Sequence, residues 1–465
     1  MTHKSRPEEA VRKELVKAIQ KWSAGNNDLE NIQELRRELI LKNHAHYLET
    51  IPSYRKLAGD AGIGNNTNIE DIKKYLTFTD GIFKSYQQEW LDNDNYPAMN
   101  RWLADIYHKP VDTDVVGVKS IDEWAERLKT AEIKLVYSSG TSGNFSFVPR
   151  EEADWVAARI TNIASLAPQL INRLAISAAK LLVKTMLPEV LMGTLAWRGL
   201  PDFDSVFLGF RRGRMGNQVL IPELAVMFEQ RSYLYDIDVT ANVLRVLTRG
   251  VRNKQEQEQL DKLQDEVVGK KRIPNYQRII EGIGASTKAG QKVFIFGAPY
   301  QFKELCEIAM NTGSRPSLKK GSLILFGGGW KSFSGEAVER EKLVGMISRT
   351  FDLPPEMILE GYSMTEISVL MLRCNHGCFH IPPLIEPVIY DDELNPVEGH
   401  DISGRFGFLD PLAVSYPGFI ISNDLVHIVD SGCKCGLQGP AIISIDRAPG
   451  QEVKGCGGIM SSIKA

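Results

Sequence analysis

The chain has 465 residues, of which 43% are hydrophobic and 24% charged, and 55 Lys and Arg against 58 Asp and Glu give a formal net charge of −3. At about 150 residues per domain the length suggests two or three packed units, and this composition excludes a disordered chain, a collagen-like repeat and a small disulfide scaffold. The near-neutral charge supplies no long-range field that would attract a polyanion, so we expect no nucleic-acid partner.

No targeting or membrane segment is expected. The first ten residues, MTHKSRPEEA, are polar and lack the apolar region of a secretory signal, which favours a cytoplasmic protein. The most apolar stretch, residues 163–197, is interrupted by Arg173, Lys180, Lys184 and two prolines, so we expect no membrane insertion. Within it, residues 166–197 are typical of a helical core, although an apolar segment of this kind could also line an acyl tunnel.

The first 130 residues are predicted to be helical. Val11, Leu15, Ile19 and Trp22 recur near the helical period of 3.6 residues. Ser120 followed by Glu123 is a capping-box pattern and predicts the start of a helix. Residues 133–137 form a short apolar, β-branched run that predicts a strand, and a helical pattern resumes near residue 151.

Strands and helices alternate through the middle of the chain. The apolar runs at residues 292–296, 322–326 and 357–359 predict strands, and residues 301–310 and 335–350 predict the helices between them. Such alternation indicates an α/β sheet with crossover connections. From residue 379 onward, short strands separated by Gly, Pro and Asp predict a β-rich subdomain. We therefore divide the chain into a helical region (1–130), an α/β core (131–370), a β-rich subdomain (371–447) and a tail (448–465).

The strongest local motif is a run of six small residues between a predicted strand and a predicted helix: Ser138, Ser139, Gly140, Thr141, Ser142 and Gly143. Small residues let the backbone wrap a phosphate, and hydroxyl and N–H groups near a helix N-terminus would donate to it. No Gly-Lys-Ser/Thr follows, so this is not a Walker loop. A plain Gly/Ser connection is the alternative. Arg211, Arg212 and Arg214 predict a solvated loop more readily than a phosphate contact.

Two motifs together resemble the adenylate-forming enzymes. The segment at residues 136–143 is similar to the phosphate-binding motif of these enzymes, and Glu360-Gly361-Tyr362-Ser363-Met364-Thr365-Glu366 is similar to their second motif. Asp424 stands where that family binds the ribose hydroxyls, and Arg447 stands where it carries a hinge arginine. The resemblance implies an α/β fold like the large domain of these enzymes, with ATP and Mg²⁺ as cofactors.

The resemblance also implies roles for single residues. Tyr362 would stack near the adenine, and Glu366 would be a Mg²⁺ ligand, since a hard cation prefers carboxylate oxygen. The full set implied to bind ATP is Ser138, Ser139, Gly140, Thr141, Ser142, Gly143, Gly328, Tyr362, Thr365, Asp424 and Arg447. Five residues separate Gly143 from Pro149-Arg150, whereas ordinary ligases place a Pro-Lys almost directly after the glycine, so the role of Arg150 stays open.

Further segments resemble the phenylacetate-CoA-ligase-like branch and, most closely, the acyl-protein synthetase subunit of bacterial fatty-acid reductase. They are Ile51-Pro52-Ser53-Tyr54-Arg55, Ile82-Phe83-Lys84-Ser85, Phe296-Gly297-Ala298-Pro299, Gly327-Gly328-Gly329-Trp330-Lys331 and His380-Ile381-Pro382-Pro383. Because 18 residues follow Arg447, we expect the mobile C-terminal domain of full-length adenylating enzymes, with its catalytic lysine, to be missing.

Cys456 matches the acylated cysteine that acyl-protein synthetases carry near the C-terminus. It lies in Val453-Lys454-Gly455-Cys456-Gly457, where Lys454 would lower the pKa of the thiol. Lys454 is also a candidate replacement for the missing catalytic lysine, and Lys331 or Lys454 could neutralise the triphosphate. An inert cysteine in a small-residue tail is the alternative.

Five of the six cysteines lie after residue 373, which suggests chemistry or metal binding rather than disulfides. Cys374, His380, Cys433 and Cys435 supply three thiolates and one imidazole, a set suited to structural zinc. Cys378 could replace His380, and ordinary buried cysteines are the alternative. His376 and His427 are expected to be polar residues of a loop and a strand.

The predicted function is activation of a carboxylic acid, with a fatty acid as the expected substrate, as acyl-AMP. The acyl group would pass to Cys456 as a thioester and then to a partner such as an acyl reductase. One alternative is a ligase that forms an acyl-CoA or an amide without using Cys456. A second alternative, from another class, is a non-catalytic scaffold subunit.

Overall fold

The computed structural model describes residues 29–139, 144–159, 202–213, 230–330, 337–430 and 433–447, with isolated positions at 14, 15, 17, 18, 22, 161, 162 and 228. It contains two compact units. Unit 1 comprises Met1–Tyr137, Asn144–Ser165 and Ser363–Gln451, and unit 2 comprises Ser138–Gly143, Leu166–Tyr362 and Glu452–Ala465. None of the helices in the described ranges has both the length and the apolar character needed to span a bilayer.

Unit 1 begins with helices, as predicted. Ser120 accepts a hydrogen bond from the Glu123 N–H, which confirms the predicted capping. The helical elements are α2 (Leu29–Thr50), α3 (Pro52–Ala61), α4 (Ile69–Tyr75), η1 (Asp80–Lys84), α5 (Gln88–Asp92), α6 (Tyr96–Asp105) and α7 (Ile121–Lys129).

The strands of unit 1 form two sheets. The larger has the order β10-β15-β14-β13-β11-β12, with antiparallel pairing throughout and with β1 added parallel to β14. β2 and β3 form a separate two-stranded sheet. The strands of these two sheets are β1 (Phe78–Thr79), β2 (Lys134–Ser139), β3 (Phe145–Arg150), β10 (Phe379–His380), β11 (Glu386–Tyr390), β12 (Pro396–Val397), β13 (Asp401–Leu409), β14 (Phe419–Val429) and β15 (Ala441–Arg447). The short strand β9 (Met371–Leu372) belongs to neither of them.

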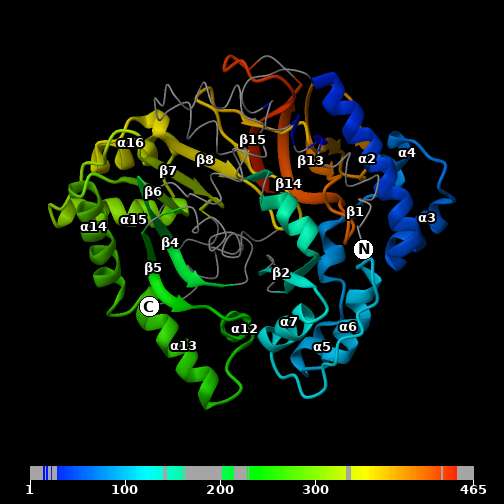
Figure 1. Cartoon of the computed structure of the whole chain (residues 1–465), viewed down its shortest axis with the longest axis horizontal. Coiled ribbons are helices and arrows are strands. Elements are labelled where there is room, and N and C mark those ends of the chain that lie inside the picture. Colours follow the sequence, from blue (N-terminus) through cyan, green and yellow to red (C-terminus); the bar gives the residue numbers. More distant parts are fainter. Residues whose placement is uncertain are drawn as a thin grey trace, which may run out of the picture. The chain divides into compact units, whose positions relative to one another are not determined.

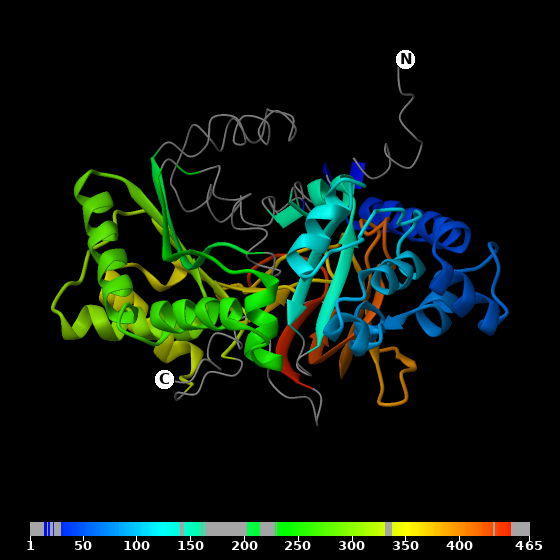
Figure 2. The ribbon, with the colours of Figure 1, turned by 90° about the horizontal axis from the view of Figure 1, so that it is seen from below.

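The first helices of unit 1 cover one face of its large sheet, and the side chains between them form a continuous core (Figures 1 and 2). Tyr47 and Tyr54 pack on Phe419 of β14, with ring centroids 5.2 and 6.0 Å apart. All three side chains are fully buried, and burial of aromatic surface is a main source of stability. The helical N-terminal region and the β-rich segment are therefore parts of one folded unit.

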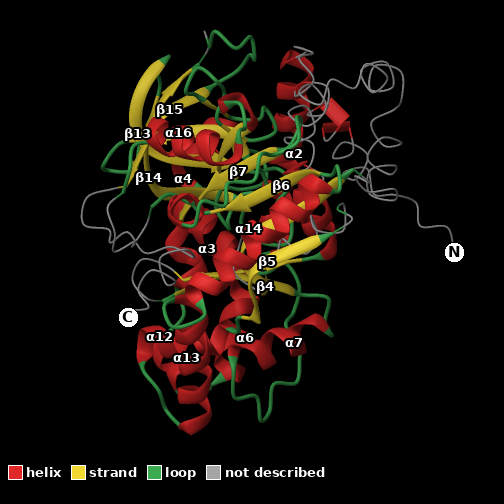
Figure 3. Cartoon of the chain, turned by 90° about the vertical axis from the view of Figure 1, so that its left-hand side faces the viewer, coloured by secondary structure: helices red, strands yellow, loops and turns green. Residues whose placement is uncertain are grey.

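Unit 2 is an α/β unit with the parallel strand order β5-β4-β6-β7-β8. Helices α14, α15 and α16 connect and cover these strands, and α14 contacts β5 and β6 (Figure 3). The elements are β4 (Phe203–Arg212), β5 (Arg231–Asp238), α12 (Ala241–Arg249), α13 (Lys254–Val267), α14 (Arg272–Lys288), β6 (Lys292–Gly297), α15 (Pro299–Asn311), β7 (Leu323–Gly327), α16 (Arg340–Phe351), η2 (Pro355–Met357) and β8 (Ile358–Tyr362).

Most of the predicted elements are confirmed, and two local predictions are wrong. The small-residue loop is followed by β3 rather than by a helix, because Phe145, Phe147 and Val148 are buried side chains of an extended segment. Arg211 and Arg212 lie at the end of β4 rather than in a loop, and Arg211 forms ion pairs with Asp236 and Asp238. The four-part division of the chain stays a prediction.

Candidate functional site

The predicted phosphate-binding loop lies between β2 and β3. Ser138 and Ser139 are the last residues of β2, and the chain is described again from Asn144, just before β3. Gly140, Thr141, Ser142 and Gly143 lie outside the described residues. A strand, not a helix, follows this loop, so phosphate binding here would depend on loop N–H and hydroxyl groups without a helix N-terminus directly behind them.

Two of the predicted ATP-binding residues belong to unit 2 and lie at the carboxyl ends of neighbouring parallel strands. Gly328 follows β7, and Tyr362 ends β8. Gly327 pairs with Gly361 in this ladder, and a Cβ on Gly327 would lie 2.7 Å from the Gly361 carbonyl oxygen, so only glycine fits. Gly328 has φ +87°, which glycine adopts without strain. Ligands of open α/β sheets bind at this edge.

The remainder of the second motif belongs to unit 1, and Arg150 holds it in place. The Arg150 guanidinium donates hydrogen bonds to the Thr365 carbonyl oxygen at 2.7 Å and to the Ile367 carbonyl oxygen at 3.4 Å. It also lies over the Tyr416 ring, 5.3 Å from the centroid, and is only 4% exposed. The sequence left the role of Arg150 open. The structure shows that it fixes the backbone on both sides of Glu366.

Two further hydrogen bonds fix this segment. Thr161 donates its hydroxyl to the Ser368 carbonyl oxygen at 2.8 Å, and the Ser368 N–H donates to Asp410 at 2.8 Å. Asp410 is fully buried, and burial raises the pKa of its carboxyl group. A segment held by three separate side chains is preorganised, which is what precise placement of a catalytic group requires.

Glu366 is a buried carboxyl group in an unusual electrostatic environment. Its side chain is 8% exposed, and its pKa is raised to about 7, first by burial and second by the charge of Asp80. Its own N–H, Lys84 and Arg150 oppose this increase in pKa. A bound cation would stabilise the charged form of Glu366. A buried carboxylate of this kind is therefore suited to bind a Mg²⁺ ion that phosphate oxygens and water would also coordinate.

Asp424 and Arg447 face each other on neighbouring strands of unit 1. They are register partners of β14 and β15, and Arg447 Nε lies 3.1 Å from Asp424 Oδ1. The preceding residue, Asn423, donates its side-chain amide to both carboxylate oxygens of Asp80 at 2.9 and 3.0 Å. Asp80 thus connects this strand with the surroundings of Glu366. Sequence reasoning missed Asp80, which lies two residues before the quoted segment Ile82-Phe83-Lys84-Ser85.

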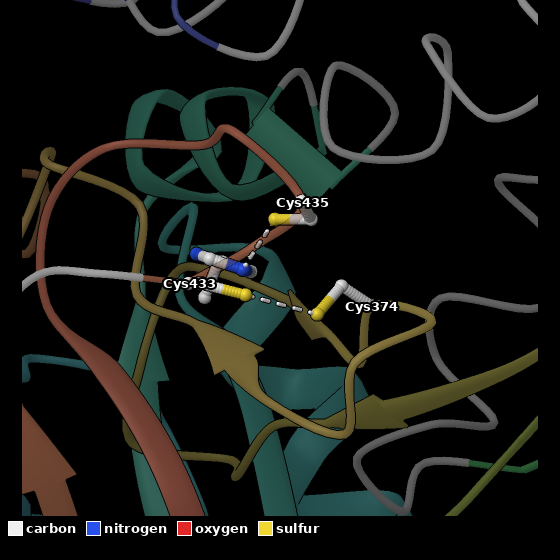
Figure 4. Close-up of side chains that lie close together, drawn as sticks. Cys374, Cys433 and Cys435 are labelled. Atoms are coloured by element: carbon white, nitrogen blue, oxygen red, sulfur yellow. Dashed lines mark hydrogen bonds between the residues drawn. The ribbon is translucent and has the colours of Figure 1, made fainter.

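The four predicted zinc ligands come together in unit 1. The ligand atoms of Cys374, His380, Cys433 and Cys435 all lie within 4.8 Å of one another. The Sγ atoms of Cys374 and Cys433 are 3.5 Å apart, and Cys435 Sγ is 3.0 Å from His380 Nε2 (Figure 4). Zn–S bonds of 2.3 Å in a tetrahedron put sulfurs about 3.8 Å apart, so the cluster has the size of a zinc site. Cys378 is not one of this set.

Several predicted residues are not placed. Lys331, Lys454, Cys456 and the apolar segment at residues 166–197 lie outside the described residues. His427 lies on β14, as predicted, and its side chain forms a hydrogen bond with that of Asp401.

The fold is that of adenylate-forming ligases. An open conformation of 2-hydroxyisobutyryl-CoA ligase in complex with its acyl-AMP and CoA has a TM-score of 0.51, with 12% identity over 88% of this chain and 73% of that chain. The same ligase in its postadenylation state has a TM-score of 0.51, with 14% identity over 90% of this chain and 68% of that chain. The α/β fold implied by the two sequence motifs is therefore confirmed.

The second half of the chain is similar to a particular family. Residues 273–464 match the family model "Acyl-protein synthetase, LuxE". A long-chain-fatty-acid–luciferin-component ligase of Vibrio harveyi is 24% identical over 188 residues, which are 40% of this chain and 49% of the relative. The ligase of the same name from Aliivibrio fischeri is 20% identical over 191 residues, 41% of this chain and 50% of the relative. The chain thus spans about half the length of these curated relatives.

Proposed function

We propose that this protein uses ATP to activate a carboxylic acid as acyl-AMP. The observation that carries the proposal is the buried Glu366, which stands in a backbone segment fixed by Arg150 within an adenylate-forming ligase fold. In the reaction, a carboxylate oxygen of the acid forms a bond to the α-phosphorus of ATP. The bond from that phosphorus to the bridging oxygen breaks, and pyrophosphate leaves with the electron pair.

The chain offers residues for each demand of this step. Glu366 would hold Mg²⁺, which neutralises phosphate charge, and Asp424 would bind the ribose hydroxyls. The small-residue loop from Ser138 to Gly143 and Gly328 would bind ATP, with the loop on the phosphate oxygens, and Tyr362 would stack near the adenine. Lys331 or Lys454 would add positive charge.

The similarity to the two luciferin-component ligases and to the acyl-protein synthetase family supports a long-chain fatty acid as the substrate. In this proposal, the Cys456 thiolate attacks the acyl-AMP carbonyl carbon, AMP leaves, and a thioester forms on the enzyme. An acyl reductase is then the proposed partner that receives the acyl group.

Acid-dependent ATP–pyrophosphate exchange tests acyl activation directly. We expect exchange with at least one fatty acid, and we expect Glu366→Gln to reduce it by about 100-fold, the scale of losing one charge-stabilising group. Formation of free acyl-CoA or amide at a rate unaffected by Cys456→Ser would favour the conventional ligase. An absence of exchange with every acid would favour the scaffold subunit.

We also propose that Cys374, His380, Cys433 and Cys435 bind a structural zinc ion. Cys374 follows β9, His380 ends β10, and Cys433 and Cys435 lie between β14 and β15, so the metal would join the segment at residues 374–380 to the turn at residues 433–436. The size of the cluster and its three thiols support zinc over a harder cation.

A further inference from the structure

Lys84 is a cation carried by the short helix η1, and its positive charge acts on the Glu366 carboxyl group. Its neighbours on both sides are fixed. Phe83 is fully buried with its ring 5.9 Å from that of Tyr416, and Ser85 accepts a hydrogen bond from the Trp102 indole N–H at 2.9 Å. η1 itself packs on β3 and β14. The backbone that carries Lys84 therefore has little freedom to move.

A chain of contacts connects η1 to the segment of Glu366. Tyr416 lies between Phe83 and the Arg150 guanidinium, and that guanidinium donates to the Thr365 carbonyl oxygen. On its other side, η1 is joined to β14 by the two hydrogen bonds from Asn423 to Asp80. The helix that carries Lys84 thus contacts the strand that carries Asp424 and is connected, through Tyr416 and Arg150, to the segment that carries Glu366.

Two cations act on the Glu366 carboxylate, and their other contacts differ. Lys84 and Arg150 both favour its charged form. Arg150 is 4% exposed and is committed to two backbone carbonyls. Lys84 keeps 22% of its side chain exposed, and its ion pair with Asp80 is long, at 3.7 Å. Exposed ion pairs of this kind contribute 1 kcal/mol or less, roughly, so exchanging Asp80 for another anion costs little.

We infer that Lys84 binds the reacting anions of the adenylation step, the carboxylate of the acid and the α-phosphate of ATP. This inference rests on the proposed function. As the carboxylate oxygen approaches the α-phosphorus, two negatively charged groups are brought together, and a fixed ammonium group beside them lowers the energy of the transition state. Lys84 transfers no proton in this step. Asp80 is a positioning residue that holds the ammonium group until substrate arrives.

The test compares ATP–pyrophosphate exchange in wild type, Lys84→Gln, Lys84→Arg and Asp80→Asn, with Lys129→Gln as the matched control. Lys129 is an exposed lysine that pairs with Glu126 three residues away. We expect Lys84→Gln to lower kcat for exchange by about 100-fold. We expect Lys84→Arg to recover part of this loss and the control to match wild type. We expect Lys84→Gln and Asp80→Asn to unfold at the same temperature as wild type.

The double variant Lys84→Gln/Asp80→Asn separates a structural ion pair from an anion-binding lysine. If Lys84 served only to neutralise Asp80, removing both charges would restore exchange, and that result would overturn the inference. Exchange by Lys84→Gln within about 3-fold of an active wild type would overturn it as well. A wild type without exchange for any acid would overturn the proposed function together with this inference, so the two failures are distinguishable.

Discussion

Arg447 Nε lies 3.1 Å from Asp424 Oδ1, and the two residues are register partners on adjacent strands. Asp424 is 7% exposed, and its N–H donates to the Ser422 hydroxyl. The carboxylate implied to bind ribose is therefore oriented by its neighbour across the sheet. Preorganisation of this kind saves the cost of ordering the side chain when ATP binds.

If Asp424 binds the ribose hydroxyls, Asp424→Ala will raise KM for ATP by about 10-fold or more, the scale of hydrogen bonds to a charged group. The comparison that checks this is exchange with ATP and with 2′,3′-dideoxy-ATP, which lacks both hydroxyls. Wild type should lose affinity for the dideoxy nucleotide and Asp424→Ala should not. Asp401→Ala, which removes another carboxylate of the same sheet, should behave as wild type with both nucleotides.

Glu366 makes stability depend on pH in the direction opposite to an ordinary paired carboxylate. Its pKa in the folded state is about 7, above the ordinary glutamate value of 4.5, so the folded state binds more protons between these two pH values. Stability should therefore fall as pH rises from about 4.5 to 7, by about 3 kcal/mol at most. Denaturant unfolding without added magnesium measures this, and Glu366→Gln should show a weaker fall. Equal pH dependence in both proteins would contradict the assignment.

Arg150→Ala removes the donor to two carbonyl oxygens and a cation over Tyr416 in a buried environment. Leaving buried acceptors unpaired costs about 1–3 kcal/mol each, so we expect a loss of about 3 kcal/mol and reduced exchange. Arg55 is the matched control, since it also donates to two carbonyl oxygens but is exposed. Arg55→Ala should cost about 0.5 kcal/mol or less. Equal unfolding free energies for the two variants would show that Arg150 does not brace this segment.

The zinc proposal predicts about one zinc ion per chain in the purified protein, measured by elemental analysis. Cys433→Ser and His380→Ala should lose the metal and lower the melting temperature, because a structural zinc contributes folding free energy. Cys378→Ser is the control that should retain it, since Cys378 is outside the four-residue cluster. Wild type without stoichiometric zinc after growth with added zinc would contradict the proposal, and metal loss on Cys378→Ser would assign the ligand differently.

The sequence predicted those elements whose pattern is local. The buried parallel strands β6, β7 and β8 are short apolar runs between helical patterns. The N-cap of the helix after Ser120 is encoded by the four residues from Ser120 to Glu123. β3 and β4 were missed because polar residues and a proline interrupt them, and their burial comes from partners far along the chain.

The candidate site was predictable where a motif carries it and not where it depends on long-range contacts. Glu366, Asp424 and the four proposed zinc ligands could be named from motifs and residue types. The role of Arg150 depends on carbonyl groups more than 200 residues away, and that of Asp80 depends on an amide more than 300 residues away. No local pattern contains such a pairing, so only the fold could show it.

The central claim is that the protein activates a carboxylic acid and carries it as a thioester on Cys456. The most direct measurement is the intact mass of the protein after incubation with ATP, Mg²⁺ and a panel of fatty acids, repeated with Cys456→Ser. We predict a mass increase of one acyl group that hydroxylamine removes and that the variant lacks. No acyl adduct with any acid, or an adduct of equal yield in Cys456→Ser, would contradict this account.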